Sequence, residues 1–225
     1  MTEMVAAAPP TAASRPTEPQ RRGPGRPRHA DTEPRAYRSA LEIFGRRGWS
    51  GLTLDGVAAH AGIGKSSIYL RWNDKGELLL DAVRDLQARV PAPDTEGLGI
   101  RELLLAHARA RADLLTGAYG PALANLCTAA AANPDVLDEI RKVDLARGMC
   151  ALTEQVEEAV RRGELAPGTA VGPLLEAIEG SILVHYLVNP TATVPELRAG
   201  LEGYVTALVD HQLRTLRRQP VPAQP

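Results

Sequence analysis

The sequence predicts an all-α protein with a small N-terminal domain and a larger helical C-terminal domain. Apolar residues recur at helical spacing from about residue 32 to residue 217, and Ala, Leu, Arg and Glu are abundant in these segments. No segment shows the apolar–polar alternation of a half-buried strand, and aromatic residues make up only 4% of the chain. Gly and Pro interrupt the helical pattern and divide it into separate elements.

The first two helices are defined by their apolar stripes and their caps. The first is expected over about residues 32–47, with Gly48 ending it. The second begins at Thr53, a good N-cap residue, and closes at Gly62. Its apolar residues fall at intervals of three and four, which makes one buried face: Leu54, Val57, Ala58 and Ala61.

The next two helices complete the N-terminal domain. The third is expected to begin near Gly64 and end near Trp72, with Ile68 and Trp72 pointing inward four residues apart. Asn73 or Asp74 caps a fourth helix that continues to about residue 89. The Pro-Ala-Pro run at 91–93 then breaks the chain. The expected divisions are a tail over 1–30, a domain over 31–91, a second domain over 92–218 and a tail over 219–225.

Five further helical patterns lie near 98–116, 119–132, 135–162, 169–188 and 195–217. The last two carry more apolar surface than one domain face needs, which favours pairing with a symmetry mate as a four-helix bundle. Ordinary core packing within one subunit is the alternative. The residues predicted to contact the partner subunit are Ile182, Leu201, Val205 and Leu208.

Charge is distributed unevenly although the net charge is only −1. Residues 21–71 hold ten Lys/Arg and four Asp/Glu, whereas residues 91–225 hold twelve Lys/Arg and seventeen Asp/Glu. A basic N-terminal part on an acidic body is typical of a module that binds DNA. An accidental excess of charge is the alternative that this count alone leaves open.

Residues 53–72 have the pattern of a helix-turn-helix, with Ala61-Gly62-Ile63 at the turn. The outer face of the second helix combines cationic, hydroxyl, aromatic and apolar groups, which suit phosphates, base edges and thymine methyls. These residues are Lys65, Ser66, Ser67, Tyr69, Leu70 and Arg71. A solvated helix face would be polar too, but no acid occurs between Asp55 and Asp74, which favours a DNA contact.

With these motifs, residues 31–90 resemble the DNA-binding domain of the tetracycline-repressor (TetR) family. The match runs through Ala40-Leu41-Glu42-Ile43-Phe44, Gly48-Trp49, Leu52-Thr53-Leu54, Val57-Ala58, Ala61-Gly62-Ile63, Ser67-Ile68-Tyr69, Trp72, Lys75 and Glu77-Leu78-Leu79. The resemblance covers about a quarter of the chain and is dense and collinear. It implies a helical homodimer that binds double-stranded palindromic operator DNA, with a small-molecule effector in the C-terminal domain and a dimer interface formed by the last two helices.

The resemblance also implies roles for individual side chains. Thr53, Tyr69 and Lys75 would contact phosphates, and Lys65, Ser66 and Ser67 would face bases or phosphates. Leu70 would meet base edges, with Arg71 beside it near the DNA backbone. Three departures put single contacts in doubt: Gly64 replaces a frequent serine cap, Gly56 lies inside the second helix, and Asp55 stands where some relatives have a cation.

The N-terminal tail contains the basic run 21–28, which resembles the Gly-Arg-Pro core of minor-groove-binding hooks. Arginines on a flexible arm can enter a narrow A·T-rich minor groove, so Arg26 and Arg28 are predicted to contact DNA. A basic tail that only aids solubility is the alternative. The tail has too few large apolar residues to order itself.

The function implied is a sequence-specific transcriptional regulator, acting as a repressor that an effector releases from its operator. Alternatives are an activator and a regulator controlled by a protein partner. Candidate effector contacts are polar or aromatic residues on apolar C-terminal helices: His107, Arg111, Asn125, Cys127, His185 and Tyr186. A remote alternative is a nucleotide-binding enzyme, because residues 59–66 nearly fit a phosphate-binding loop, although no strand precedes them.

Little else in the sequence suggests catalysis, a metal or a membrane. Cys127 and Cys150 form no CxxC pair or His/Cys cluster, so neither a zinc site nor a disulfide framework is expected, and no cofactor is predicted. Glu176 and Glu179 lie one turn apart and are interpreted as part of an interface or a pocket rim. No signal peptide or membrane span is recognisable, so a cytoplasmic location is expected.

Overall fold

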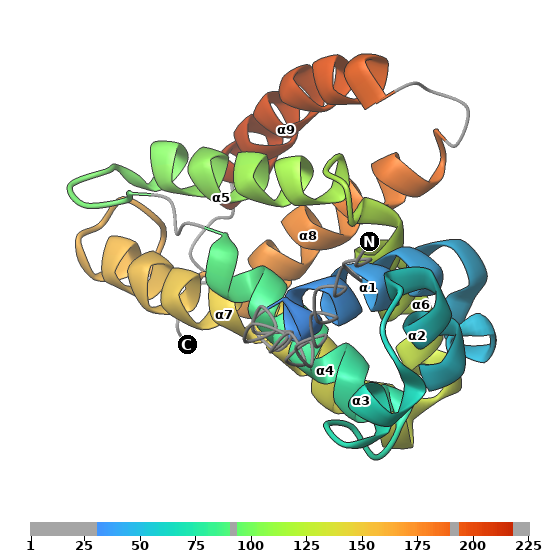
Figure 1. Cartoon of the computed structure of the whole chain (residues 1–225). Coiled ribbons are helices and arrows are strands. Elements are labelled where there is room, and N and C mark those ends of the chain that lie inside the picture. Colours follow the sequence, from blue (N-terminus) through green and yellow to red (C-terminus); the bar gives the residue numbers. More distant parts are fainter. Residues whose placement is uncertain (1–30, 91–93, 190–193, 218–225) are drawn as a thin grey trace, which may run out of the picture. The chain divides into compact units, whose positions relative to one another are not determined.

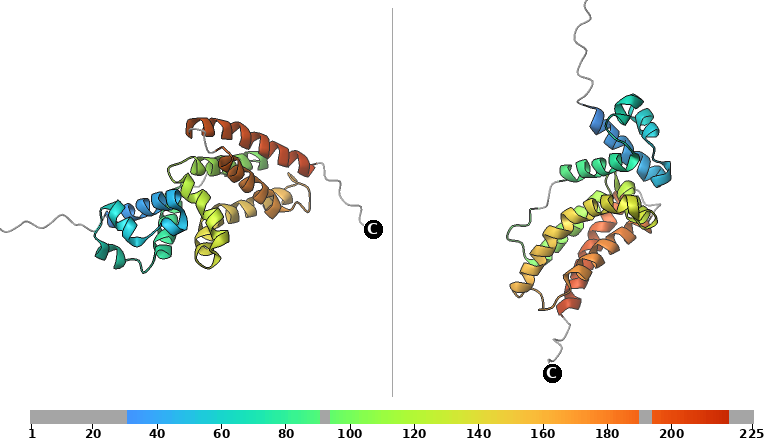
Figure 2. Two further views of the ribbon diagram at one scale, coloured as in Figure 1. Left: turned by 90° about the vertical axis from the view of Figure 1, so that its right-hand side faces the viewer. Right: turned by 90° about the horizontal axis from the view of Figure 1, so that it is seen from below.

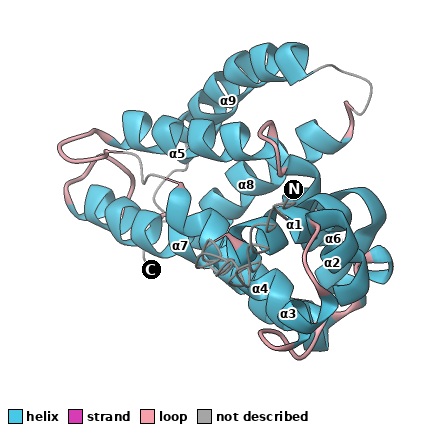
Figure 3. Cartoon of the chain, viewed as in Figure 1, coloured by secondary structure: helices cyan, strands magenta, loops and turns pink. Residues whose placement is uncertain are grey.

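The computed structural model describes residues 31–90, 94–189 and 194–217. Within these ranges the chain forms nine helices and no strand (Figure 3), which confirms the all-α prediction. The helices are α1 (Thr32–Gly51), α2 (Leu54–Ala61), α3 (Lys65–Tyr69), α4 (Lys75–Arg89), α5 (Ile100–Leu115), α6 (Gly120–Ala132), α7 (Pro134–Arg161), α8 (Val171–Leu187) and α9 (Val194–Arg217). The two tails, the break at 91–93 and the predicted contacts Arg26 and Arg28 lie outside the described residues.

The observed helices follow the predicted ones closely, with two local differences. α1 is assigned through to Gly51, but Gly48 has φ 65° and ψ −169°, so the regular helix ends there as its sequence predicts. α3 is shorter than expected, because helical hydrogen bonding stops at Tyr69 and Leu70 already occupies its C-cap.

The first hydrophobic core lies among α1 to α4 but extends beyond them. Phe44, Ile68 and Leu78 are almost completely buried at its centre. Residues of the C-terminal part close it: Ala122, Leu126 and Ala130 from α6, and Leu137 and Ile140 from α7. α6 packs on α1 and α7 packs on α4 (Figures 1 and 2). The first hydrophobic core therefore includes residues from both sides of the Pro-Ala-Pro run in the sequence.

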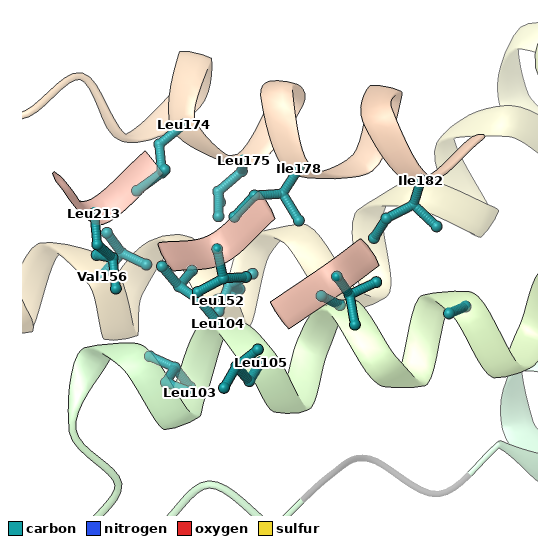
Figure 4. Close-up of a cluster of buried hydrophobic side chains, with 14 of the residues drawn as sticks. Leu103, Leu104, Leu105, Leu152, Val156, Leu174, Leu175, Ile178, Ile182 and Leu213 are labelled. Carbon is teal, nitrogen blue, oxygen red and sulfur yellow. The ribbon is translucent and has the colours of Figure 1, made fainter. Parts of the chain in front are cut away.

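The second core is formed by α5, α7, α8 and α9 (Figure 4). Ile182, Leu201 and Val205 belong to it, with exposed fractions of 0%, 1% and 0%. The prediction that these three side chains face a partner subunit therefore needs correction, because α5 and α8 of the same chain already cover the apolar stripe of α9. Leu208 packs against this core and is half-buried.

None of the described helices combines the length and the apolar character needed to span a lipid bilayer.

Candidate nucleic-acid interface

The turn of the helix-turn-helix is fixed by backbone and side-chain contacts. Thr53 caps α2, its hydroxyl accepting a hydrogen bond from the Gly56 N–H at 3.0 Å. Gly62 follows α2 with φ 61° and ψ 40°, a left-handed conformation that favours glycine. Arg35 of α1 donates to the carbonyl oxygens of Ala61 and Gly62. The reversal between α2 and α3 is therefore held both by its own sequence and by α1.

Two residues anchor the recognition helix from behind, as predicted. Ile68 is fully buried and Trp72 is 2% exposed. The Trp72 indole N–H donates to Asp81 Oδ2 at 3.0 Å, and its ring packs edge-on against Tyr37 with centroids 5.8 Å apart. These contacts orient α3 by its inner side and leave its outer side free.

The outer side of residues 65–71, called here the recognition surface, is open to solvent. Leu70 is 84% exposed and Tyr69 is 54% exposed, unusual values for such large side chains. Lys65 and Ser66 are exposed, whereas Ser67 and Arg71 are half-buried. Sequence reasoning therefore identified a surface that the fold brings together and presents outward, with Thr53 exposed at the start of α2.

Asp55 ties two residues of the recognition surface to α2. Lys65 Nζ donates to Asp55 Oδ2 at 2.6 Å, and the Tyr69 hydroxyl donates to Oδ1 at 3.2 Å. The hydrogen bond from Lys65 holds the pKa of Asp55 below its usual value, and the same bond raises the pKa of Lys65. Sequence reasoning noted Asp55 only as a departure from the family and missed this contact.

Within the described residues, the other two predicted cationic contacts are Arg71 and Lys75, and both have partners within the chain. Arg71 donates to the Ser67 carbonyl at 3.0 Å and lies 3.5 Å from Glu33. Lys75 donates to the Trp49 carbonyl at 2.7 Å, with its ammonium 4.1 Å from the centre of the Trp49 ring. Lys75 thus joins α4 to the end of α1, and a phosphate contact by it stays a prediction.

Two of the unexpected glycines have local explanations. A Cβ on Gly56 would lie 2.9 Å from the Thr53 hydroxyl oxygen, so a side chain there would crowd the α2 cap. Gly64 is the N-cap of α3 and offers no side-chain hydrogen bond, as expected. α3 is held on its inner side by the buried Ile68.

A buried ionic cluster lies between α5 and α8 in the C-terminal part. The Glu179 carboxylate accepts a hydrogen bond from His107 Nε2 at 2.6 Å. Its other oxygen lies 2.9 Å from Arg111 Nε. Burial tends to raise the pKa of Glu179, but the hydrogen bond from His107 and the charge of Arg111 outweigh it and lower the pKa. Within the chain Glu179 therefore serves as the partner of His107 and Arg111, whereas Glu176 is exposed.

Asn125 has a structural role that the sequence did not reveal. Its side-chain amide donates to the carbonyl oxygens of Phe44 and Gly45, each at 3.0 Å. Gly45 is closely approached by α6, since a Cβ there would lie 3.0 Å from the Ala122 nitrogen. Asn125 therefore clamps α6 of the C-terminal part to α1 of the helix-turn-helix domain.

The remaining predicted effector contacts are dispersed. His185 stacks on Tyr204 with centroids 4.0 Å apart, and Tyr186 packs partly buried against the second core. Cys127 is half-buried on α6. The structure does not bring the six predicted residues into one site, and their role in effector binding stays untested.

A cavity of about 400 Å³ lies where α4, α5 and α6 meet. The sequence alone does not predict it, because its lining combines residues of α4, of α5, of the turn between α5 and α6, and of α6. Apolar side chains predominate, and Asp113 is the one lining residue with a charge: the lining is Leu86, Val90, Ala110, Asp113, Leu114, Gly117, Ala118, Tyr119 and Leu123. A cavity of this size and polarity suits a small organic ligand.

The segment that nearly fits a phosphate-binding loop has the wrong structural context. Residues 59–61 belong to helix α2, and a nucleotide-binding loop must follow a buried strand. The carbonyl groups of its turn are occupied by Arg35. The enzyme alternative is therefore not favoured.

Comparisons with known proteins agree with this geometry. Residues 37–82 match the family model described as bacterial regulatory proteins of the tetR family, and residues 92–211 match the tetracyclin repressor-like C-terminal domain. The regulator YdeS of Bacillus subtilis is 25% identical over 73% of this chain and 83% of its own. The regulator Rv1556 of Mycobacterium tuberculosis is 28% identical over 88% of this chain and 90% of its own.

The fold is shared with solved structures at low identity. The fatty acid degradation regulator FadR of Bacillus halodurans aligns with a TM-score of 0.65 and 16% identity, covering 83% of this chain and 97% of its own.

Proposed function

The chain belongs to the TetR family of transcriptional regulators, and on that premise we propose that it is a homodimeric repressor released from a palindromic operator by a small molecule. The observation that carries the DNA-binding part is the recognition surface, open on its outer side and anchored through Ile68 and Trp72 on its inner side. A dimer presents two such surfaces to successive major grooves. Bound beside a promoter, it obstructs polymerase, and it acts in the cytoplasm, where that DNA is.

The proposed dimer contact lies at the end of α8. Val184, Leu187 and Val188 are exposed by 56%, 44% and 66%, although each is a large apolar residue. Their neighbours in α8 and α9 are already buried in the second core. Exposed apolar groups next to a packed core are what a second subunit would cover, so these three residues replace Ile182, Leu201 and Val205 as proposed interface residues.

The proposed effector site is the cavity between α4, α5 and α6. Leu86 and Val90 place the end of α4 in its wall, and Leu123 places α6 there. α6 is hydrogen-bonded to α1 through Asn125, and α4 follows directly after the recognition helix. A ligand here contacts α4 and α6, the two helices that connect the helix-turn-helix domain to the C-terminal helices. It can therefore favour one arrangement of the two DNA-binding domains of the dimer over another. The lining favours an apolar effector.

Replacing Ala110 with Trp should block effector binding and leave DNA binding intact. The half-buried Ala110 lines the cavity, and an indole there would occupy the space of the ligand. Among apolar compounds that release the wild-type protein from DNA, the concentration needed for release should rise by about tenfold or more, a change of about 1.4 kcal/mol. Ala106→Trp, one turn earlier on α5 and outside the cavity lining, is the control. Equal responses of the two variants would place the effector elsewhere.

Deleting residues 1–28 should weaken DNA binding several-fold. The folded domain over 31–90 holds nine Lys/Arg and eight Asp/Glu, whereas the run 21–28 adds four arginines and no acid. The arm therefore supplies much of the positive charge that attracts phosphates. Binding is measured by fluorescence anisotropy over a series of salt concentrations. A deletion of 1–20, which keeps the arginines, is the control, and an unchanged affinity and salt slope without residues 1–28 would argue against any role of the arm.

The experiment that tests the function itself is selection from a random pool of duplexes with the purified full chain. The proposal predicts enrichment of an approximate palindrome. A dimer that binds no duplex even at low salt would contradict it.

A further inference from the structure

We propose that Asp55 limits the affinity of this regulator for DNA by acting as an internal substitute for a phosphate. The proposal rests on the proposed function, because it takes Lys65 and Tyr69 to be DNA contacts. In the free protein the Asp55 carboxylate holds both residues; on DNA they must exchange it for a phosphate oxygen.

The geometry gives each oxygen of Asp55 one donor. Oδ2 accepts from the Lys65 ammonium at 2.6 Å and Oδ1 accepts from the Tyr69 hydroxyl at 3.2 Å. These are an ammonium and a phenol, two of the donor types with which this surface is expected to hold the DNA backbone. A carboxylate and a phosphate offer the same kind of anionic acceptor, so the free protein already satisfies the donors that DNA would satisfy.

The two anionic acceptors compete for the same donors, because the Tyr69 hydroxyl has a single proton to donate and charge repulsion disfavours a phosphate beside Asp55. A phosphate oxygen that accepts a hydrogen bond from the Lys65 ammonium lies within a few ångströms of the Asp55 carboxylate, and two like charges at that separation repel. Lys65 and Asp55 are both well exposed, by 66% and 48% of their side chains, so the pair can open in water without unfolding α2 or α3. DNA binding therefore includes the opening of this contact.

The exchange of Asp55 for a phosphate as the partner of Lys65 can be measured through the salt dependence of DNA binding. A lysine that neutralises a phosphate displaces a condensed cation from DNA and makes binding more salt-dependent. When Lys65 leaves Asp55, the freed carboxylate beside the phosphates offsets the charge that Lys65 brings, so fewer condensed cations are released. Asp55 is also the last acid before Asp74 along the chain, so no other acidic side chain of α2 or α3 competes for the same donors.

The consequence is a general restraint on affinity. Because the exchange is the same on every duplex, Asp55 weakens binding to arbitrary DNA as well as to the operator. Genomic DNA presents a large excess of non-specific sites. A regulator that binds the DNA phosphates more weakly spends less time on these non-specific sites, and an effector releases it from DNA more easily.

The test compares Asp55→Asn with wild type in the full chain, on a duplex of random sequence and on the duplex enriched by wild type. The substitution should raise affinity for both duplexes about two- to fivefold at moderate salt, the range expected for an exposed ion pair. It should also steepen the salt slope by about one. Asp85→Asn is the matched control, since Asp85 pairs with Arg89 on α4 at 2.8 Å and has no contact with the recognition surface. It should change affinity less than Asp55→Asn does.

Any one of three results would overturn the inference. Equal effects of Asp55→Asn and Asp85→Asn would reduce Asp55 to a contribution to net charge, and weaker binding by Asp55→Asn would make it a positioning residue for Lys65. In a Lys65→Ala background, Asp55→Asn should lose most of its effect on DNA affinity. If Asp55→Asn lowers the melting temperature of the protein, Asp55→Ser serves as a second variant. If wild type binds neither duplex, the proposed function fails; if wild type binds and Asp55→Asn matches it, only this inference fails.

Discussion

A Leu70→Glu variant should fold normally and lose about 100-fold or more in DNA affinity. Leu70 is 84% exposed at the end of α3, so the substitution removes no buried contact and the free energy of unfolding should change little. On DNA the new carboxylate would lie among base edges and phosphates without a cation of its own. Such an unpaired, desolvated charge costs about 3 kcal/mol of binding free energy, which corresponds to the predicted loss.

The matched control is Ala88→Glu, which adds the same charge at an exposed position of α4 away from the recognition surface. It should bind DNA within a few-fold of wild type. If Leu70→Glu binds as well as Ala88→Glu, then Leu70 does not enter the groove, and the orientation of α3 on DNA differs from the one proposed.

A Glu179→Leu variant should lose about 3–5 kcal/mol in the free energy of unfolding. The side chains of His107, Arg111 and Glu179 are only 15%, 7% and 14% exposed, so the Arg111 guanidinium and the His107 ring would remain in a poorly hydrated site without their carboxylate. Removing one partner of a buried ion pair has an effect of this size. Chemical denaturation followed by far-UV circular dichroism measures it.

The control is Glu202→Gln, which breaks a pair of similar length at the surface. Glu202 lies 2.6 Å from Arg109, but their side chains are 57% and 46% exposed. The expected loss is below about 1 kcal/mol. A Glu179→Leu loss as small as the Glu202→Gln loss would mean that the buried cluster contributes nothing beyond a surface pair.

The lowered pKa of Glu179 also predicts a pH dependence. The group binds protons less readily in the folded than in the unfolded chain, so it stabilises the fold at neutral pH. This contribution should fall as the pH drops below the ordinary glutamate value of about 4.3 and through the lower folded-state pKa. The wild type should therefore lose its stability advantage over Glu179→Leu in acid.

The helices and the recognition surface could be predicted because their signals are local. Thr53, Gly62 and Asp74 mark helix ends by side-chain or backbone chemistry that acts within a few residues. Ile68 and Trp72 identify the buried side of α3, and the opposite side must then be exposed.

What the sequence did not reveal depends on contacts between distant segments. Glu179 meets His107 across 72 residues, and Asn125 meets Phe44 across 81 residues. The apolar stripe that contains Leu201 and Val205 correctly predicted that this face of α9 is buried. It did not predict which chain buries the face, because a partner subunit and α5 of the same subunit would both require the same apolar pattern. Helical periodicity predicts that a helix face is buried, but only the three-dimensional packing shows which helix or subunit buries it.

If residues 65–71 of both subunits enter the major groove, they should protect guanine N7 from methylation. On the duplex enriched by wild type, we expect two protected clusters about 34–36 Å apart, related by the symmetry of the palindrome. N7 lies in the major groove, so protection reports occupancy of that groove. Unprotected N7 atoms on a duplex that wild type binds tightly, or a single cluster without a symmetric counterpart, would show that α3 does not lie in the groove of both half-sites.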